Sequence, residues 1–373
     1  MSKSAVTIFL AFFFLTFWML LRQIHQNAPN QKPDQPISES RVNSSITFLS
    51  DDAVIQRTSD CASYFEFMNH FSSKKSRFSE KNTFPLAFAI SAHFQVGILE
   101  LFLATSFDPL DSYCIHVDAK ADEKVTKAVD QMVKCYQWKH PKATIFTVDD
   151  PISVFWGHFS VLEADLKCMQ LLRTRNTHWN LLINPAGTEL PLKPMPEIRK
   201  YLEKFPNGII DSFPLPEGNK GRFVVSKENE NNTKTDQVKE SPPGNIVMRK
   251  GSKNVALSRE LVDFFLDDPS SKGLQEWLQD KSVPDEHFYS TIITLINNGT
   301  QDLNSDSTYG GCVRLSWWGD NNCKGENVRA VCNFGLQDLP RLYQDGNCLF
   351  ANKFNLDVDS IAPLFHALYL LNS

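Results

Sequence analysis

Residues 84–93 read FPLAFAISAH, and this apolar stretch is predicted to be a buried strand. It is followed by QVGILELFLATSF at 95–107, a predicted helix, and by SYCIHVDAK at 112–120, a second predicted strand. In that second strand apolar positions alternate with His116 and Asp118. A strand, a helix and a strand at this spacing indicate a βαβ unit, in which the two strands are parallel.

The alternation of strand and helix continues to residue 187. The further predicted elements are a helix at 121–136, a strand at 143–148, a helix at 161–175, a strand at 178–187, and a strand entering a helix at 251–266, with Ser258 near its cap. We therefore expect an α/β fold, with a parallel sheet covered by helices on both faces. Ligands of such sheets lie beyond the carboxyl ends of the strands, and Asp118 is expected at such an end.

The composition is that of an ordinary globular protein. The chain has 373 residues, of which 42% are hydrophobic and 22% charged, and its 28 Phe allow a sizeable core. This length suits one large domain or two intimate lobes. The net charge is -5 and no basic stripe is present, which argues against a nucleic-acid partner.

The N-terminus is predicted to anchor the protein in a membrane. Residues 5–21 carry no charge, and as a helix they would rise about 25 Å, the short end of a membrane span. A cleaved signal peptide is the alternative, but bulky residues run straight into Arg22 without a small-residue cleavage site. We expect a short cytoplasmic tail at 1–4, an uncleaved signal-anchor at 5–21 and a luminal stem at 22–60.

Several features favour the lumen of the secretory pathway for the rest of the chain. The stem is rich in Pro, Asn, Gln and Ser and is expected not to fold. Eight cysteines without a CxxC pair favour up to four disulfides in an oxidising compartment over a zinc site. Three sequons for N-glycosylation lie at Asn43, Asn231 and Asn298.

Residues 213–246 interrupt the strand and helix pattern. They are polar and rich in turn residues. We predict a mobile surface loop for most of this segment, and a lid or acceptor-binding loop is the alternative.

The stretch SVPDEHFYSTIITLI at 282–296 contains two adjacent carboxylates at the start of a predicted helix. Proline and acids suit the first turn of a helix, and Ser282 with Asp285 resembles a capping box. One acid would be enough for the cap, which leaves the other free to act as a general base if a cleft lies above it. We expect Asp285 to cap the helix and Glu286 to react.

Two cations near the C-terminus are candidates for binding an anion. Arg329 and Lys353 are each flanked by apolar residues, although surface cations are the more common case. A cation at a buried edge needs an anion, and a phosphate group can supply it. The strand that ends at Asp118 carries a single acid instead of Asp-x-Asp, so protein cations are expected to neutralise a diphosphate in place of a metal.

The sequence resembles the core-2/I-branching β-1,6-N-acetylglucosaminyltransferase family over roughly residues 61–360. The resemblance is carried, in the family's order and spacing, by FPLAFAISAH, YCIHVDAKAD, VFWGHFSVLEADLKCM, WNLLINPAGTELPLK, GSKNVALSRE, SVPDEHFYSTI, VRAVCNFGLQDL and LFANKFNLDVD. It implies a GT-A-like (Rossmann-like) glycosyltransferase domain at 61–373, in the lumen, on a single-pass type II protein of the Golgi membrane. It also implies transfer of GlcNAc from UDP-GlcNAc with inversion, no metal and no other cofactor.

The resemblance implies roles for individual residues. Glu286 corresponds to the catalytic base that takes the proton from the 6-hydroxyl of an O-glycan acceptor. Arg329 and Lys353 correspond to the pair that grips the diphosphate, and Asp118 and Trp156 to donor contacts. The disulfides implied by the family are Cys61–Cys135, Cys114–Cys168 and Cys323–Cys332.

The sequence also departs from the family pattern. Ala186 and Glu189 stand where a cysteine and an aspartate are usual. Because no cysteine follows residue 348, the family's bridge from stem to tail cannot form, and Cys312 and Cys348 are expected to pair instead. The acceptor-binding residues after 213 cannot be aligned. A transferase of another UDP-sugar, xylose or glucose, and a non-catalytic membrane-tethered glycan-binding relative therefore remain alternatives.

Overall fold

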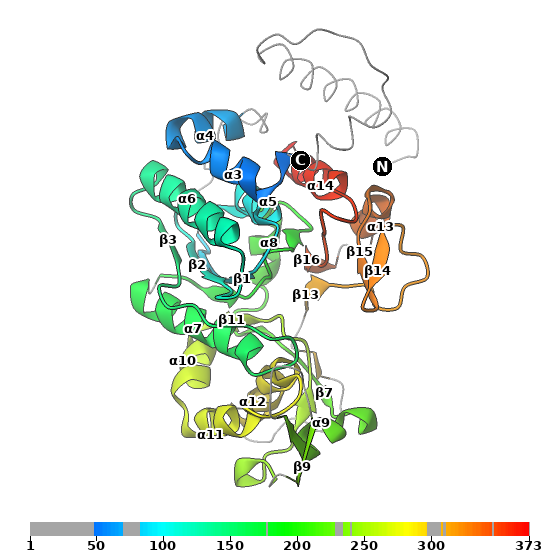
Figure 1. Ribbon diagram of the computed structural model, residues 1–373. Coiled ribbons are helices and arrows are strands. Elements are labelled where there is room, and N and C mark those ends of the chain that lie inside the picture. Colours follow the sequence, from blue (N-terminus) through cyan, green and yellow to red (C-terminus); the bar gives the residue numbers. More distant parts are fainter. Residues whose placement is uncertain are drawn as a thin grey trace. The chain divides into compact units, whose positions relative to one another are not determined.

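A six-stranded sheet lies at the centre of the fold (Figure 1). The structure is a computed structural model that describes residues 48–69, 83–176, 178–227, 234–238, 241–296, 307–308, 311–344 and 347–372. The strands lie in the order β3-β2-β1-β4-β11-β6. Their bounds are β1 Leu86–Ala92, β2 Ser112–Val117, β3 Thr144–Thr147, β4 Leu181–Ile183, β6 Gly208–Ile209 and β11 Ala256–Ser258. The strands and helices predicted up to residue 187 are present, and the fold is α/β.

The prediction of a parallel sheet is right for the pairing of four strands and wrong for β11, which runs opposite to its neighbours. β1, β2, β3 and β4 are parallel, whereas β11 is antiparallel to both β4 and β6. The direction of β11 is set by the edge at which the chain enters the sheet again. Asn184, directly after β4, donates to the carbonyl of Lys253 and accepts from the N–H of Val255. The chain therefore arrives at the carboxyl edge, and β11 has to run in the opposite direction.

Helices cover both faces of the sheet, because side chains of one strand alternate between them. In β1, the large Phe88 and Ile90 belong to one core cluster, and the small Ala87 and Ala89 to the other. The first cluster includes helices α3 Asp51–Arg57, α5 Val96–Ser106, α6 Glu123–Lys139, α8 Met195–Leu202, α13 Leu339–Gln344 and α14 Ile361–Asn372. The second includes α7 Ser160–Arg175, α10 Arg259–Asp267, α11 Pro269–Leu278 and α12 Phe288–Ile296.

Four disulfides cross-link the described part of the chain. They join Cys61 to Cys135, Cys114 to Cys168, Cys312 to Cys348 and Cys323 to Cys332. Three are the pairs that the family resemblance implied, and the fourth is the pair expected from the two remaining cysteines. Cys114 lies in β2 and Cys168 in α7, so this bond fixes α7 to the strand that leads to Asp118.

The predicted boundary of the stem is wrong for its last residues. Residues 48–60 include helix α3, and Leu49 and Val54 are completely buried in the core. Asp51 accepts a hydrogen bond of 2.7 Å from the N–H of Val96 at the start of α5. A few apolar residues at helical spacing, inside a polar composition, are enough for this helix to dock. The next helix, α4 Cys61–Asn69, is fixed by the first disulfide.

Several predictions lie outside the described residues. These are the tail at 1–4, the signal-anchor at 5–21, the stem as far as residue 47, and the sequons at Asn43, Asn231 and Asn298. Among the helices of the described part of the chain, none is both long and apolar enough to cross a membrane.

Smaller sheets stand beside the central sheet. One has the order β13-β16-β5 and another the order β10-β7-β12, and two hairpins pair β14 with β15 and β8 with β9. Their bounds are β5 Leu190–Pro191, β7 Asp211–Pro214, β8 Val225–Lys227, β9 Lys234–Val238, β10 Arg249–Lys250, β12 Ser307–Thr308, β13 Cys312–Leu315, β14 Glu326–Val328, β15 Val331–Asn333 and β16 Cys348–Ala351. The segment 213–246, predicted as a mobile loop, thus contains the β8–β9 hairpin and the short helix α9 Gly221–Val224.

A buried ion pair fixes the first strand of the sheet. Arg199 of α8 donates two hydrogen bonds to the carboxylate of Asp111, at 2.9 and 2.6 Å, and Asp111 also accepts from the N–H of Leu86. Asp111 is 0% exposed and Arg199 9% exposed. Removing one partner of such a pair leaves a buried charge without compensation.

We expect Arg199→Met to lower the free energy of unfolding by about 3–5 kcal/mol, which is the usual cost of breaking a buried pair on one side. Lys200→Met is the matched control, because Lys200 is the exposed neighbour on the same helix. Urea unfolding followed by circular dichroism measures both. Equal stability of the two variants would show that the Asp111 pair is not a structural anchor.

Candidate active site

The carboxyl end of β2 holds a nearby segment of chain in place. The buried His116 accepts a hydrogen bond of 3.0 Å at Nε2 from the N–H of Ile152, whose carbonyl accepts from the N–H of Ala119. The carboxylate of Asp118 accepts from the N–H of Val154 at 3.3 Å. Residues 152–154 therefore lie along the carboxyl edge of the sheet, where the ligand site was expected.

Asp118 is charged and already has a partner. Lys120 Nζ lies 2.8 Å from Asp118 Oδ2 and also donates to the carbonyl of Val154. Burial opposes ionisation of Asp118, but the hydrogen bonds from Lys120 and from backbone N–H groups outweigh it and hold the pKa below its ordinary value. This carboxylate can accept a ligand hydroxyl beside Lys120, and the ammonium keeps the local charge neutral.

The segment 154–157 links Asp118 by hydrogen bonds to the turn that carries the predicted base, Glu286. Its first residue, Val154, donates to Asp118, and the carbonyl of its last residue, Gly157, accepts from the N–H of Val283 at 2.8 Å. Four residues span at most about 14 Å when fully extended. Trp156 lies within this segment and is 71% exposed. An exposed indole between two polar groups is a suitable surface for a base or a sugar ring.

The two adjacent carboxylates lie in a tight turn before helix α12. Residues Pro284–Glu286 form one 3₁₀ turn, and α12 begins only at Phe288. Val283 precedes this turn with a φ of 53°, in the left-handed region that β-branched residues rarely adopt. The capping box predicted for Ser282 and Asp285 is wrong, because Val283 occupies the cap and no side chain caps the turn. Proline and two acids suit the first turn of a helix, and this pattern does not reveal a separate turn before it.

Asp285 is buried instead of capping. It is 8% exposed, and its Oδ1 has no hydrogen-bond partner among the described residues. Burial raises the pKa of this carboxyl to about 6, with the positive charge of Lys253 opposing the shift and the negative charge of Glu286 adding to it. At neutral pH, therefore, a second negative charge lies behind Glu286.

Glu286 points into a cationic environment. Its Oε2 lies 2.7 Å from Arg222 Nη1 and 3.1 Å from Lys250 Nζ, and its side chain is 27% exposed. Its carbonyl accepts a hydrogen bond from the N–H of Gly251, which ties the turn to β10. Burial opposes ionisation, but the hydrogen bonds and charges of Arg222 and Lys250 outweigh it and lower the pKa of Glu286.

The buried His287 holds Arg222 in its position beside Glu286. It is 0% exposed; its Nδ1 lies 2.7 Å from the carbonyl of Arg249 and its Nε2 lies 3.1 Å from Arg222 Nη1. Burial lowers the pKa of His287 to about 4, so the ring is neutral. A neutral ring that donates from Nδ1 to the carbonyl accepts at Nε2, and it thereby orients the Arg222 guanidinium toward Glu286.

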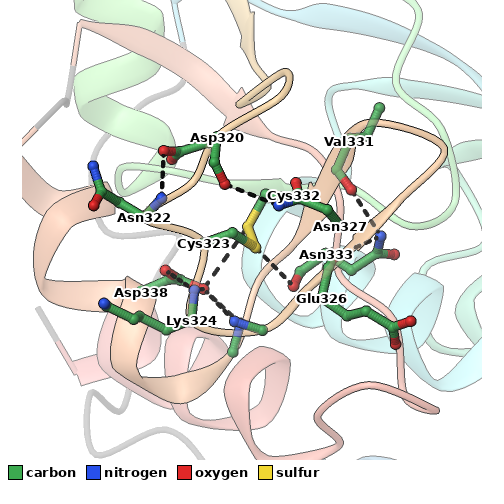
Figure 2. Close-up of a disulfide and its surroundings, with 12 residues drawn as sticks. Asp320, Asn322, Cys323, Lys324, Glu326, Asn327, Val331, Cys332, Asn333 and Asp338 are labelled. Atoms are coloured by element: carbon green, nitrogen blue, oxygen red, sulfur yellow. Dashed lines mark hydrogen bonds between the residues drawn. A yellow bond between two sulfur atoms is a disulfide. The ribbon is translucent and has the colours of Figure 1, made fainter.

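Arg329 lies at the tip of the β14–β15 hairpin. Arg329 and Ala330 form its two-residue turn, with φ values of 51° and 64°. Non-glycine residues adopt this conformation at a cost of order 1 kcal/mol, and it persists where the surroundings determine it. Figure 2 shows the base of this hairpin, where the Cys323–Cys332 disulfide lies beside Asp338. Arg329 is exposed and lies within the loop that the Cys323–Cys332 disulfide closes.

The base of the hairpin is a closed polar arrangement. The carboxylate of Asp338 accepts from the N–H groups of Lys324, Gly325 and Gly335, at 2.9 to 3.1 Å (Figure 2). Among the described residues, Cys323, Cys332 and Asp338 are the one group of three potential metal ligands that lie together. The two sulfurs are bonded to each other and the carboxylate is taken up by backbone N–H groups, so these atoms already have a structural role.

Lys353 lies in a different environment from Arg329. Burial, with the positive charge of Arg329 adding to it, lowers the pKa of the Lys353 ammonium. Burial and the charge of Lys353 likewise lower the pKa of His93, which directly follows β1. Within the described ranges, no carboxylate forms an ion pair with Arg329 or Lys353. Two neighbouring cations that lack a carboxylate partner are a candidate binding site for an anion.

A buried network joins the loop of Lys353 to the edge of the central sheet. Glu189 is 0% exposed, and its Oε1 accepts from Asn352 at 3.3 Å, from Asn254 at 3.3 Å and from Arg314 at 3.5 Å. Asn254 also donates to the carbonyl of Asn184, at the end of β4. Glu189, which departs from the family pattern by one methylene, thus fixes the residue before Lys353 to the carboxyl edge of the sheet.

The site therefore has two groups of side chains. His93, Asp118, Arg329 and Lys353 interact through their charges on one side, and Arg222, Lys250 and Glu286 form ion pairs on the other. The sequence profile of the family described as "Core-2/I-Branching enzyme" matches residues 86–343. The chain belongs to this family. The match covers the central sheet as well as both groups of side chains, except for Lys353.

Individual relatives extend the similarity to most of the chain. The N-acetyllactosaminide β-1,6-N-acetylglucosaminyl-transferase of Mus musculus is 32% identical over 316 residues, which are 82% of this chain and 76% of the relative. The β-1,3-galactosyl-O-glycosyl-glycoprotein β-1,6-N-acetylglucosaminyltransferase of Homo sapiens is 31% identical over 83% of this chain and 75% of the relative. This core-2/I-branching family member is therefore an enzyme, a glycosyltransferase similar to β-1,6-N-acetylglucosaminyltransferases.

Among solved structures, the xyloside xylosyltransferase 1 of mouse covers 74% of this chain and 98% of its own, with 12% identity and a TM-score of 0.34. A TM-score this low does not establish a shared fold.

Two residues of the site of this family member were not predicted. Arg222 lies in the segment expected to be a loop, and Lys250 immediately precedes the GSKNVALSRE block. Neither residue belongs to a periodic pattern, and both reach Glu286 only through the tertiary fold. The one available signal was the apolar run at 223–225 inside a polar segment, since such a run indicates packing, and Phe223 is indeed buried.

Proposed function

We propose that this family member transfers GlcNAc from UDP-GlcNAc to the 6-hydroxyl of an O-glycan acceptor, forming a β-1,6 branch, on a GT-A-like fold. The donor, the linkage and the acceptor class are those in the names of its relatives or implied by the family motifs of its sequence. The observation that carries the proposal is that the half-buried Lys353 lies within electrostatic range of the exposed Arg329, because a diphosphate is an anion that two such cations can bind.

The proposed reaction is a single displacement with inversion at the anomeric carbon. The acceptor oxygen forms a bond to C1 of the sugar, the bond from C1 to the diphosphate oxygen breaks, and the electron pair leaves with UDP. Glu286 takes the hydroxyl proton at Oε. Asp118 and Trp156 would contact the donor, the first as an acceptor for hydroxyl groups and the second as a flat surface for a ring.

The proposed reaction needs no metal. Two side-chain cations, Arg329 and Lys353, would balance the charge that builds up on the departing diphosphate, which is the task of a divalent cation in enzymes that use one. Lys353 supports this, because burial makes its ammonium a stronger partner for an anion than an exposed lysine would be.

The proposed location is the Golgi membrane, with a single N-terminal anchor and the catalytic domain in the lumen. Four disulfides among eight cysteines support an oxidising compartment. The apolar residues 5–21 and three sequons support the anchor and the secretory route.

We expect UDP release from UDP-GlcNAc in the presence of a core-1 O-glycan acceptor to continue unchanged in excess EDTA. The measurement uses a panel of UDP-GlcNAc, UDP-xylose and UDP-glucose, each with and without acceptor. A preference for another donor would replace the sugar in the proposal, and loss of activity in EDTA would contradict the role of the two cations. Binding of the acceptor without turnover of any donor would favour a glycan-binding protein.

A further inference from the structure

The predicted base is held by two cations, and this is unfavourable for a base. Arg222 and Lys250 both contact the same oxygen of Glu286, Oε2, at 2.7 and 3.1 Å. An ion pair stabilises the carboxylate and so weakens its affinity for a proton. A general base works best when its pKa is near the working pH, but here the pKa of Glu286 is lowered. The arrangement without acceptor is therefore a resting arrangement.

The two cations differ in how firmly they are held. Arg222 Nη1 also contacts His287 Nε2, a buried ring that is fixed by the carbonyl of Arg249. Lys250 Nζ contacts, besides Glu286, the carbonyl of Gly251 at 3.2 Å. Lysine has a flexible four-carbon stem and a point charge, so Lys250 can move without disturbing the fold.

A second carboxylate is available to Lys250 nearby. Lys250 of β10 pairs with Phe213 of β7, and Asp211 is the first residue of the same β7. Gly251 lies so close to Asp211 that a Cβ on it would come within 2.1 Å of the Asp211 carbonyl oxygen. Burial raises the pKa of Asp211, and the charges of Lys250 and Arg314 lower it. The charge of Lys250 therefore already acts on the carboxyl group of Asp211.

We propose that Lys250 is a positioning residue that keeps Glu286 in an ion pair until the acceptor binds. The acceptor hydroxyl takes the place of the ammonium at Oε2, and Lys250 turns toward Asp211. The proposal rests on the proposed function, in which Glu286 is the base. Partly exposed ion pairs contribute little to stability, so the contacts of a bound sugar can offset the loss of this one.

The consequence is protection of the donor. In hydrolysis a water oxygen bonds to C1, the bond from C1 to the diphosphate breaks, and Glu286 receives the proton from that water. Before the acceptor arrives, water at the site meets a carboxylate that Lys250 has made a weak base. The other charged groups beside Glu286 are Arg222, which contacts it, and Asp285, on which the charge of Lys253 also acts; His287 is neutral. Because Arg222 is also held by His287, Lys250 is the cation that can be removed with the least effect on the others.

Lys250→Met tests the proposal, with Lys250→Arg as the conservative variant and the exposed Lys200→Met as the control. We expect Lys250→Met to raise acceptor-free UDP release from UDP-GlcNAc several-fold relative to transfer. We also expect the acid limb of its pH–rate profile to move up by about 1 pH unit, because an opposite charge at this distance shifts a pKa by about 1–3 units. Lys250→Arg should behave like the wild type in both measurements.

A readout without turnover separates this proposal from the proposed function. The carboxyl pKa of Glu286 is measured by ¹³C NMR on protein labelled at glutamate Cδ, with the resonance assigned by its absence in Glu286→Gln. An unchanged pKa and an unchanged ratio of hydrolysis to transfer in Lys250→Met would overturn the role of Lys250. A raised pKa in Lys250→Met together with undiminished turnover in Glu286→Gln would uphold the ion pair and reject Glu286 as the base.

Discussion

Glu286→Gln is expected to reduce turnover by about 10²–10⁴-fold, the range that positioned general bases contribute, while the affinity for UDP stays close to that of the wild type. Glutamine has the shape of glutamate and can accept hydrogen bonds from Arg222 and Lys250, but it cannot take a proton from the acceptor hydroxyl. In the proposed reaction the diphosphate is bound by other residues, Arg329 and Lys353, so UDP binding should be unaffected. A kcat effect without a binding effect is the signature of a group that acts only in the chemical step.

The measurement combines UDP release at saturating donor and acceptor with isothermal titration calorimetry of UDP. Glu203→Gln is the matched control, because Glu203 is an exposed glutamate at the end of α8. Thermal melting of both variants shows whether the uncompensated charges of Arg222 and Lys250 alter the fold. Turnover near that of the wild type would exclude Glu286 as the base, and a parallel fall in UDP affinity would place Glu286 in the donor site instead.

The elements of the central sheet could be predicted because their signals are local. The buried runs that became β1 and β2 are bounded by helical stretches, and each element was found at its place in the chain. The direction of β11 could not be predicted, because a short apolar strand has the same sequence pattern in either orientation. Its direction follows from the hydrogen bonds of Asn184 with residues 253 and 255, contacts across the fold that no periodicity reveals.

The residues of the candidate site likewise fall into those that local sequence identified and those that only the fold reveals. Glu286, Lys353 and Asp118 stand in sequence blocks that resemble a family, so their position in the chain identified them as candidates. Arg222 and Lys250 reach Glu286 from 64 and 36 residues away along the chain (286 − 222 and 286 − 250), and only the fold brings them together. Asp285 is a case in which the local pattern misled: an aspartate at this position suits a helix cap, but the observed turn buries it. Local patterns thus find candidate groups but do not give the charge that surrounds them.

Lys353→Ala is expected to weaken the binding of UDP by about 10- to 150-fold, because a hydrogen bond between charged groups contributes about 1.5–3 kcal/mol and 1.4 kcal/mol corresponds to a factor of ten. Half-burial of the ammonium and its fixed neighbour Asn352 make this contact the stronger of the two. Arg329→Ala should have a smaller effect of the same kind, because Arg329 is exposed on a hairpin turn and water screens its charge.

The two cations should also be coupled, and this coupling is the sharper test. Each cation stabilises the two phosphate charges of bound UDP. If both bind the same diphosphate, the variant that combines Arg329→Ala with Lys353→Ala should therefore lose less affinity for UDP than the sum of the two single losses. Calorimetry of UDP and of uridine completes the cycle, since uridine has no phosphate and its affinity should not change in any variant. Lys324→Ala removes an equal charge from an exposed site near the Cys323–Cys332 disulfide and should bind UDP as the wild type does. Equal losses for UDP and uridine in Lys353→Ala would mean that Lys353 supports the shape of the pocket, and the diphosphate would then need a different partner.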